Sequence, residues 1–223
     1  NSYVGTSFKQ YIEKKNGNMP LEERWHVTFV SVRNSEWKKM DFSKYDTILH
    51  VAAIVHQKEQ PEMEALYYAV NTKLTEELAD KARAERVRQF VFLSTMSVYG
   101  MTMGQITEET ECTPITFYGK SKLAAERYLC EQRSDTFKVA VIRPPMIYGK
   151  ACTGNYASLE KLAGKIPVFP RVSNERSMIY IENLCEFLCQ IMLLKPYHRN
   201  SVVLLPQNGE WTKTSDMVKE IAK

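Results

Sequence analysis

Short apolar segments alternate with amphipathic segments along the 223-residue chain, and this alternation predicts an α/β fold with a doubly wound parallel sheet. The apolar runs are short and nearly continuous, as expected of strands that are covered on both faces. The segments between them repeat apolar residues at helical spacing, as expected of helices that pack on a sheet. Polar or hydroxyl-bearing residues follow several runs, which predicts a ligand site beyond the carboxyl ends of the strands.

The first half of the chain begins with a predicted helix from Tyr3 to Lys15, whose apolar residues share one face. Asn16 and Gly17 then supply a stop signal, because glycine tolerates the left-handed conformation common at helix ends. A β-branched run and a more apolar run predict two strands, and a long apolar stripe predicts a second helix. These three elements span His26–Val32, Asp46–Ala53 and about Glu62–Arg83.

The second half continues the alternation up to Gly149 and then becomes less regular. A strand, a helix and a strand are predicted over Gln89–Thr95, Tyr118–Gln132 and Lys138–Ile142. The later elements are a helix near Asn155–Ala163, a strand over Met178–Ile181, a helix over Glu182–Leu194, a strand over Val202–Leu205 and a helix from Thr214.

This change of pattern predicts two domains. Residues 1–149 would form the main sheet domain, and residues 150–223 a partial second lobe that returns elements to the first domain at about 175–195. The chain opens on a helix, whereas a sheet of this kind normally begins with a strand near its middle. We therefore expect a first strand before Asn1 in the native chain, because its absence would leave unpaired backbone groups on both neighbours.

Composition excludes several other classes of protein. A hydrophobic content of 44% with 25% charged residues is ordinary for a globular protein and unlike long disorder. The net charge of +4 is spread along the chain, and no basic arm indicates nucleic-acid binding. Five cysteines without a Cys-x-x-Cys motif indicate reduced thiols and a cytoplasmic location. No residue grouping has metal-ligand spacing, and the most apolar stretch is too short to span a membrane.

The sharpest motif is Tyr118-x-x-x-Lys122 within a predicted helix. Residues four apart share a helix face, so the Lys122 ammonium can lie near the Tyr118 phenol and lower its pKa from about 10. The tyrosine then becomes a usable acid or base near neutral pH. Thr95, at the end of a predicted strand, could bind a substrate oxygen beside it. Taken alone, the pair also suits a solvated helix face, and Thr95 also suits a cap on its own backbone.

Five landmarks together resemble the extended short-chain dehydrogenase/reductase family, in particular its NAD-dependent epimerase/dehydratase branch acting on nucleotide sugars. They cover most of the chain and are specific for the family, although not for one reaction. The resemblance implies a Rossmann-like fold. In order, the landmarks are Asn1–Gly5 (NSYVG), His50–Ala53 (HVAA), Ser94–Gly100 (STMSVYG), Tyr118–Lys122 (YGKSK) and Arg143–Gly149 (RPPMIYG).

The resemblance implies a role for individual residues. Tyr118 would be the general acid/base, Lys122 its pKa-lowering partner and a ribose ligand, and Thr95 the hydroxyl that orients the substrate. Further residues would bind NAD or NADP. They are Tyr3, Val4 and Gly5 at the pyrophosphate, Asp41 and Phe42 at the adenine, Ala52 and Ala53 at the middle of the cofactor, Asn71 and Ser94 in support, and Pro144 and Pro145 beside the nicotinamide. Of these, Asp41, Asn71 and the two prolines suit turns or caps equally well.

Three departures from the family pattern narrow this expectation. Ser2 stands where a glycine of the phosphate-binding turn is expected. Arg33 follows the strand predicted over His26–Val32, at a position where the family carries an acidic residue that binds the ribose of NAD. An arginine at this position more often accompanies the 2′-phosphate of NADP, so Arg33 slightly favours NADP. Met96 and Ser97 stand where 4,6-dehydratases of the family carry Asp-Glu, which disfavours a 4,6-dehydratase.

The expected function is therefore an NAD(P)-dependent epimerase of a nucleoside-diphosphate sugar that acts through transient hydride transfer and a keto intermediate. The alternative is an NADPH-dependent reductase of a keto-sugar or another carbonyl compound, and the third candidate is a non-catalytic dinucleotide-binding sensor. The resemblance also implies a homodimer through helices 62–83 and 118–132. A nucleotide sugar is the expected partner, with no nucleic acid, membrane or metal ion.

Overall fold

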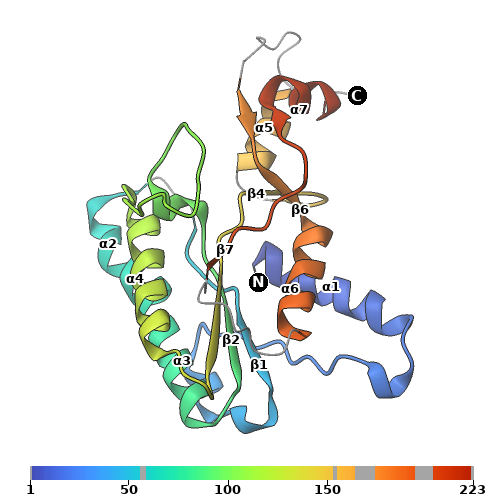
Figure 1. The fold of residues 1–223 in the computed structure, drawn as a ribbon, viewed down its shortest axis with the longest axis vertical. Helices are drawn as coiled ribbons and strands as arrows, with labels where there is room; N and C mark the ends of the chain where they lie inside the picture. Colours follow the sequence, from blue (N-terminus) through green and yellow to red (C-terminus); the bar gives the residue numbers. More distant parts are fainter. Residues whose placement is uncertain (1, 56–58, 153–154, 164–173, 194–202, 222–223) are drawn as a thin grey trace.

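The computed structural model confirms the doubly wound parallel sheet (Figure 1). It describes residues 2–55, 59–152, 155–163, 174–193 and 203–221. The central sheet has four parallel strands in the order β1-β2-β3-β7. These strands span Thr47–His50 (β1), Gln89–Leu93 (β2), Lys138–Ile142 (β3) and Val203–Leu204 (β7).

Helices cover both faces of this sheet: α1 and α6 lie on one face, and α3 and α4 on the other (Figure 1). Successive strand residues point to opposite faces, so Val91 enters the core beneath α1 and α6 while Phe92 enters the core beneath α3 and α4. The two apolar layers fix the sheet between the helices. The four helices span Tyr3–Gly17 (α1), Leu74–Ala84 (α3), Phe117–Gln132 (α4) and Ile181–Leu193 (α6).

The helix predicted over residues 62–83 is confirmed, but its hydrogen bonding changes along its length. A 3-10 turn, Pro61–Met63, leads into α2 (Glu64–Tyr67), and the π-helical turn Tyr68–Lys73 joins α2 to α3. Such π-turns inside α-helices occur frequently at functional sites. The remaining 3-10 turns span Leu21–Glu23, Ser35–Lys39, Phe42–Lys44 and Met96–Tyr99.

The strand predicted over His26–Val32 is wrong. This segment has no regular secondary structure, and the side chains of Val27, Phe29 and Val30 are 37%, 45% and 41% exposed. β-branched residues favour a strand only where a neighbouring strand can pair with them. Within the part of the chain that the structure describes, β1 pairs only with β2, so the segment lacks the ladder that its sequence would suit.

A second, smaller group of elements lies beyond the central sheet (Figure 1). Within it β4 pairs in parallel with β6, β5 pairs antiparallel with β8, and α5 packs against α7. The chain then returns to the main sheet through α6 and β7. These outer elements span Met146–Tyr148 (β4), Asn155–Ala163 (α5), Glu175–Arg176 (β5), Met178–Tyr180 (β6), Thr212–Lys213 (β8) and Thr214–Ile221 (α7).

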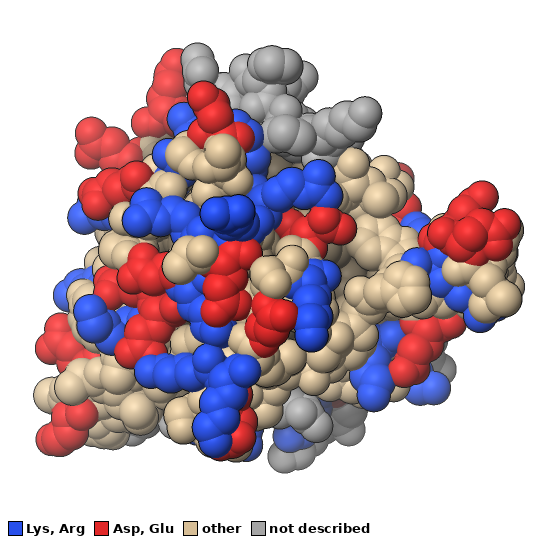
Figure 2. Space-filling view, turned by 90° about the horizontal axis from the view of Figure 1, so that it is seen from below, with Lys and Arg blue, Asp and Glu red and all other residues tan. Residues whose placement is uncertain are grey.

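Charges of both signs are interspersed on the face of the molecule that Figure 2 shows. This face therefore presents no extended field of one sign, in agreement with the low net charge of +4. In the described parts of the chain, no helix has the length and apolar character needed to cross a membrane.

A polar cluster joins α1 to α6 at the edge of their apolar contact. Glu186 Oε2 accepts hydrogen bonds from Tyr11 Oη at 2.6 Å and from Lys15 Nζ at 2.5 Å. Gln190 Nε2 donates to the other carboxylate oxygen at 2.6 Å. The hydrogen bonds from Lys15 and Tyr11 lower the pKa of Glu186 from 4.5 to about 2, because they favour the ionised form.

Glu186→Gln is expected to remove an acid-dependent part of the stability. Because the pKa of Glu186 is lowered by folding, its contribution is present above about pH 4.5 and is lost as the pH falls toward about 2. Urea unfolding followed by circular dichroism should show a midpoint that falls more steeply with acidification in the wild type than in the variant. Glu13→Gln, which removes an exposed ion pair with Lys9 on α1, is the matched control and should follow the wild type. Equal slopes for wild type and Glu186→Gln would contradict this assignment.

Candidate functional site

The beginning of α4 is held by acceptors from two other points of the chain. Thr116 Oγ1 caps the helix by accepting the Gly119 amide at 3.0 Å. The Glu59 carboxylate, from the segment after β1, accepts the amides of Phe117 and Tyr118 at 2.8 and 3.0 Å. A helix N-terminus has unpaired amides and favours negative charge. Glu59 therefore positions the turn that carries Tyr118, and no sequence motif pointed to it.

The structure brings Thr95 and Tyr118 together, as the motifs predicted. Thr95 follows Ser94 at the end of β2, and its Oγ1 accepts the Ser97 amide at 3.1 Å, so it also caps its own 3-10 turn. Thr95 forms a side-chain hydrogen bond with the phenol of Tyr118, which is only 6% exposed. The two hydroxyls are therefore adjacent and largely shielded from water.

The pKa of Tyr118 is raised in the structure, whereas the sequence predicted that Lys122 would lower it. Burial of the phenol raises its pKa to about 12; the hydrogen bond with Thr95 opposes this, and Tyr67 adds to it. The Lys122 Nζ lies over the ring of Phe92, 4.0 Å from its centroid. The prediction that Lys122 lowers the pKa of Tyr118 is wrong for the chain by itself. Desolvation of the phenol outweighs the effect of the Lys122 ammonium, because that group is directed toward the sheet.

Lys122 is 1% exposed, and its Nζ has no hydrogen-bond partner among the described residues. Burial lowers its pKa to about 7, an effect that the carboxylate of Glu126 partly opposes. An unpaired buried donor costs about 1–3 kcal/mol, so this position favours a ligand that accepts a hydrogen bond. A ribose hydroxyl would meet that requirement, and Lys122 therefore fits the ribose of a dinucleotide.

Asn71 joins the π-helical turn both to α4 and to the segment after β1. Its Oδ1 accepts the Ile54 amide at 2.9 Å, and its Nδ2 donates to Ile54 O and to Ser121 Oγ, both at 3.1 Å. Ser121 Oγ in turn donates to Tyr118 O at 3.0 Å. Asn71 is fully buried, so it supports the site by holding two segments together rather than by direct contact with a ligand.

Gly5 lies where the start of α1 approaches the end of β1. A Cβ atom at this position would lie 2.9 Å from Ser2 Oγ and 3.4 Å from Val51 Cγ2. Ser2 Oγ accepts the Gly5 amide at 3.1 Å and so caps the helix. The absence of a side chain permits this close approach, which places the helix N-terminus beside the segment that carries Ala52 and Ala53. A helix N-terminus of this kind suits a pyrophosphate.

Other residues expected to contact the cofactor have structural contacts of their own. The side chain of Val4 is 7% exposed and lies in the core beneath α1. Phe42 is 4% exposed and stacks on Trp37. Asp41 caps a 3-10 turn by accepting the Ser43 amide at 3.0 Å. Contacts of these residues with adenine or pyrophosphate stay predictions, and their local roles account for their residue types.

The remaining predicted residues lie at the ends of strands or on the surface. Arg33 is exposed on the irregular segment that precedes β1. Tyr3 Oη donates to Lys150 O at 3.3 Å, which joins the start of α1 to the outer elements. Pro144 is buried and Pro145 half-buried directly after β3. Their place at the carboxyl end of a central strand is compatible with the predicted contact with the nicotinamide.

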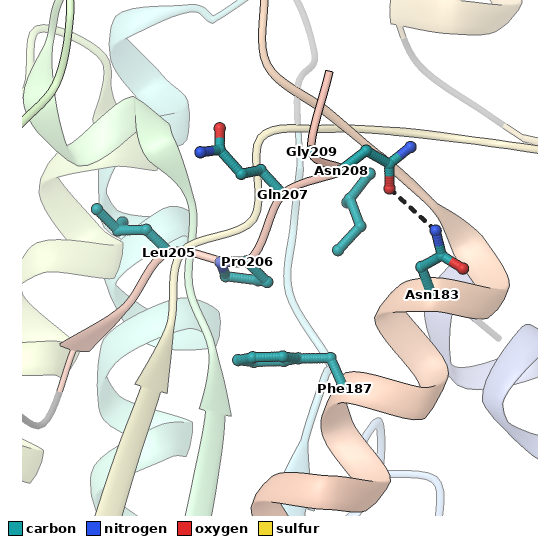
Figure 3. Close-up of a pocket in the computed structure, with 8 residues that line it drawn as sticks. Asn183, Phe187, Leu205, Pro206, Gln207, Asn208 and Gly209 are labelled. Carbon is teal, nitrogen blue, oxygen red and sulfur yellow. Dashed lines mark hydrogen bonds between the residues drawn. The ribbon is translucent and has the colours of Figure 1, made fainter. Parts of the chain in front are cut away.

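A pocket of about 480 Å³ lies between α6 and the chain after β7 (Figure 3). Its wall combines apolar side chains with two asparagines, and Asn183 Nδ2 donates to Asn208 Oδ1 at 3.0 Å. None of the predicted catalytic or cofactor residues lines it, so it is separate from the Thr95 and Tyr118 pair. The lining residues are Ile179, Asn183, Phe187 and Leu205 to Gly209.

Within the described residues, no cluster of His, Cys, Asp and Glu could hold a metal ion.

Known proteins share this sequence pattern. Residues 7–200 match the model of the NAD dependent epimerase/dehydratase family. A UDP-glucose 4-epimerase from Vibrio cholerae is 33% identical over 184 residues, which cover 78% of this chain and 56% of the relative. An N-acetyl-alpha-D-glucosaminyl-diphospho-ditrans,octacis-undecaprenol 4-epimerase from Escherichia coli is 30% identical over 162 residues, with coverages of 70% and 48%. The chain thus spans about half the length of these curated relatives.

Solved structures share the fold at lower identity. MoeE5 in complex with UDP-glucose and NAD superposes with a TM-score of 0.77 at 20% identity, covering 99% of this chain and 78% of that one. A dTDP-glucose 4,6-dehydratase from Bacillus anthracis in complex with NAD gives a TM-score of 0.72 at 17% identity, with coverages of 99% and 77%. At such identities the likeness establishes the fold.

Lys122→Met is expected to stabilise the protein, because methionine fills a similar volume without burying an unpaired charge. The expected gain is about 1–3 kcal/mol, or a rise in Tm of roughly 2–10 °C, measured by calorimetry. Lys120→Met, an exposed lysine on the same helix, is the control and should leave the Tm nearly unchanged. A lower Tm for Lys122→Met would show that the buried ammonium is satisfied in solution.

Proposed function

Because the chain belongs to the NAD dependent epimerase/dehydratase family, we propose that it binds NAD(P) and epimerises a nucleoside-diphosphate sugar. The observation that carries this proposal is the pair of adjacent hydroxyls, Thr95 and Tyr118, with the unpaired Lys122 ammonium one helical turn away. The two relatives named as 4-epimerases support the reaction class. We further propose that residues 1–149 bind the cofactor and that residues 150–223 contribute to the sugar site.

In this mechanism Tyr118 exchanges the proton and Thr95 holds the reacting oxygen. The Tyr118 phenolate takes the proton of a sugar hydroxyl, while the carbon that bears this hydroxyl loses a hydride and becomes a ketone. When bound, NAD(P) would supply the hydride acceptor and, once the ketone has turned over in the site, the hydride donor to its other face. Tyr118 Oη then gives the proton back to the same oxygen, and the Thr95 hydroxyl, turned from Ser97 Oγ toward the substrate, donates a hydrogen bond to it.

The raised pKa of Tyr118 defines what Lys122 must do. With a pKa of about 12 the phenol is protonated at neutral pH, so it acts readily as an acid and needs a nearby cation to act as a base. We infer that the Lys122 ammonium would supply this charge if it leaves the Phe92 ring to donate a hydrogen bond to the ribose of the cofactor.

A reductase of a keto-sugar or another carbonyl compound is the second candidate. The protonated Tyr118 favours it, because reduction of a carbonyl requires an acid that gives a proton to the oxygen. Arg33 would also favour it if this exposed guanidinium faces the adenosine of the cofactor, where it would suit the 2′-phosphate of NADPH. This reaction would use Thr95 and Tyr118 in one direction only.

A 4,6-dehydratase is less well supported by the side chains than an epimerase. Water elimination needs carboxyl groups next to the active threonine, and the residues after Thr95 are Met96 and Ser97. Ser97 Oγ is already engaged, since it accepts a hydrogen bond from Thr95 Oγ1 at 3.2 Å. Dehydratases share this fold, so the distinction depends on these positions rather than on the scaffold.

We propose a homodimer through α2, α3 and α4, where Leu66 and Tyr68 are 48% and 36% exposed, and a monomer in light scattering would contradict it.

The five cysteines carry no disulfide in the structure, which supports a cytoplasmic location. A non-catalytic sensor is the third candidate, and the preserved pair of Tyr118 and Lys122 argues against it.

Tyr118→Phe is expected to lower kcat by about 10²–10⁴-fold while leaving NAD(P) affinity nearly unchanged, because only the proton-transferring oxygen is removed. Turnover of a panel of UDP- and dTDP-sugars, followed by NMR, together with cofactor titration by calorimetry, provides the measurement. Tyr128→Phe is the matched control, since Tyr128 lies on the same helix and bonds to Asp80 away from Thr95. Undiminished turnover in Tyr118→Phe would refute the assignment.

Mass spectrometry of the nucleotide released on denaturation should distinguish the first two functions. An epimerase regenerates its cofactor in every cycle, so we expect stoichiometric NAD(H) in the purified protein. An empty protein that takes up NADPH reversibly would instead support the reductase.

Arg33→Asp should shift cofactor preference from NADP toward NAD if Arg33 faces a 2′-phosphate, because an aspartate would repel the phosphate and could bind the ribose hydroxyls. The ratio of the two dissociation constants is the measurement. Lys14→Asp, an exposed charge reversal on α1, controls for surface charge. An unchanged ratio would remove Arg33 from the cofactor site.

A further inference from the structure

A buried carboxylate, Glu126, lies on the same face of α4 as Tyr118 and Lys122. It is 2% exposed and accepts hydrogen bonds from Arg143, through Nε at 3.1 Å and Nη2 at 2.5 Å. Ser94 Oγ donates to the Glu126 Oε1 atom. The helix that carries the proposed acid/base is thereby bound to the end of β2 at Ser94 and to the end of β3 at Arg143.

Arg143 extends this connection to a fourth segment. It is 7% exposed, its Nη1 donates to Tyr99 Oη at 2.7 Å, and its guanidinium lies over the Tyr99 ring, 4.8 Å from the centroid. Tyr99 closes the 3-10 turn that Thr95 begins. Both ends of that turn are therefore tied to the same buried ion pair, one through Ser94 and the other through Tyr99.

Stability alone does not account for charges at this position. An ion pair that loses its hydration is often replaced by apolar residues without loss of stability. The contacts of Glu126 and Arg143 instead reach Ser94, the neighbour of Thr95, and Tyr99, at the other end of the turn that Thr95 begins. The positions of Thr95 and of α4 relative to each other thus depend on a group that touches neither hydroxyl of the proposed pair.

We propose that Glu126 is a positioning residue, whose carboxylate sets Thr95 against Tyr118 and keeps a negative charge beside Lys122. This proposal rests on the proposed function. Its first part follows from the hydrogen bond to Ser94, the neighbour of Thr95. Its second part follows from the spacing of Glu126 and Lys122, one turn apart on the buried face of α4.

The groups around Lys122 indicate the direction of the electrostatic effect. Glu126 raises its pKa against the larger effect of burial, which holds it near 7. From β1, His50 also faces Lys122, but burial and the lysine charge lower its pKa to about 3, so it is neutral. From β2 the neighbour is the uncharged Phe92 ring. Removal of the Glu126 charge, with Arg143 left behind it directly after β3, should therefore lower the pKa of Lys122 further.

The first test is Glu126→Gln, which keeps the shape of the side chain and removes its charge. We expect kcat to fall by roughly 10- to 100-fold, because a small misplacement of a reacting group suffices for such a loss. The alkaline limb of the pH–rate profile should move down by about one pH unit, since Lys122 would lose its proton earlier. Glu186→Gln, which removes an ion pair at the α1–α6 contact, is the control and should preserve both values.

A double variant separates positioning from folding. Glu126→Gln alone leaves Arg143 buried without its partner and should lower the Tm by about 10 °C. Glu126→Gln with Arg143→Met removes both charges and should recover much of that Tm. If Glu126 is a positioning residue, kcat and the alkaline limb stay displaced in the double variant. Recovery of activity together with the Tm would overturn the proposal and leave a purely structural ion pair.

Lysine NMR provides a readout that does not require turnover. The titration of Lys122 Nζ, assigned with Lys122→Met, should shift down by about one pH unit in Glu126→Gln. If the wild type turns over no nucleotide sugar but this titration shifts, the proposed function fails while the electrostatic coupling stands. If the wild type is active and neither the titration nor the pH–rate profile moves, the positioning proposal fails and the proposed function stands.

Discussion

The parallel pairing of β2 with β3 is the constraint on which the candidate site depends. The ladder pairs Leu93 with Ile142, and the Ser94 amide extends it by donating to Ile142 O at 2.7 Å. Both strands therefore leave the sheet at the same edge, and the hydroxyl-bearing turn after β2 meets the first turns of α4 there. Because α4 connects the parallel strands β2 and β3, it runs back along them from their carboxyl ends, and its first turn brings Tyr118 beside Thr95.

Several ionisable side chains are buried near the carboxyl ends of these strands. Burial raises the pKa of Tyr118 to about 12 and lowers the pKa values of Lys122 and His50 to about 7 and 3. In each case the neutral form is favoured, because the low dielectric of the interior penalises charge. A core selected for stability alone would not hold a lysine whose Nζ lacks a hydrogen-bond partner among the described residues. Strongly shifted pKa values of this kind are typical of functional sites, where stability is given up for chemistry.

The scaffold and the reaction are separable in this protein. Proteins named as epimerases and as dehydratases share the family pattern or the fold with this chain. The sheet and its covering helices supply only the edge at which reactive groups gather. The side chains that follow β2 here are those of Ser94, Thr95, Met96 and Ser97, and none of them is a carboxylate.

The sequence by itself determined the order of the main helices and strands outside residues 26–32, because helical periodicity and short apolar runs are local properties of the chain. It also indicated the pairing of Thr95 with Tyr118, since both motifs lie next to predictable elements. The irregular course of residues 26–32, the cap that Glu59 provides and the direction of the Lys122 side chain were decided only by the tertiary structure. Each of these depends on contacts between segments far apart in the chain or on burial, and local patterns carry no information about either.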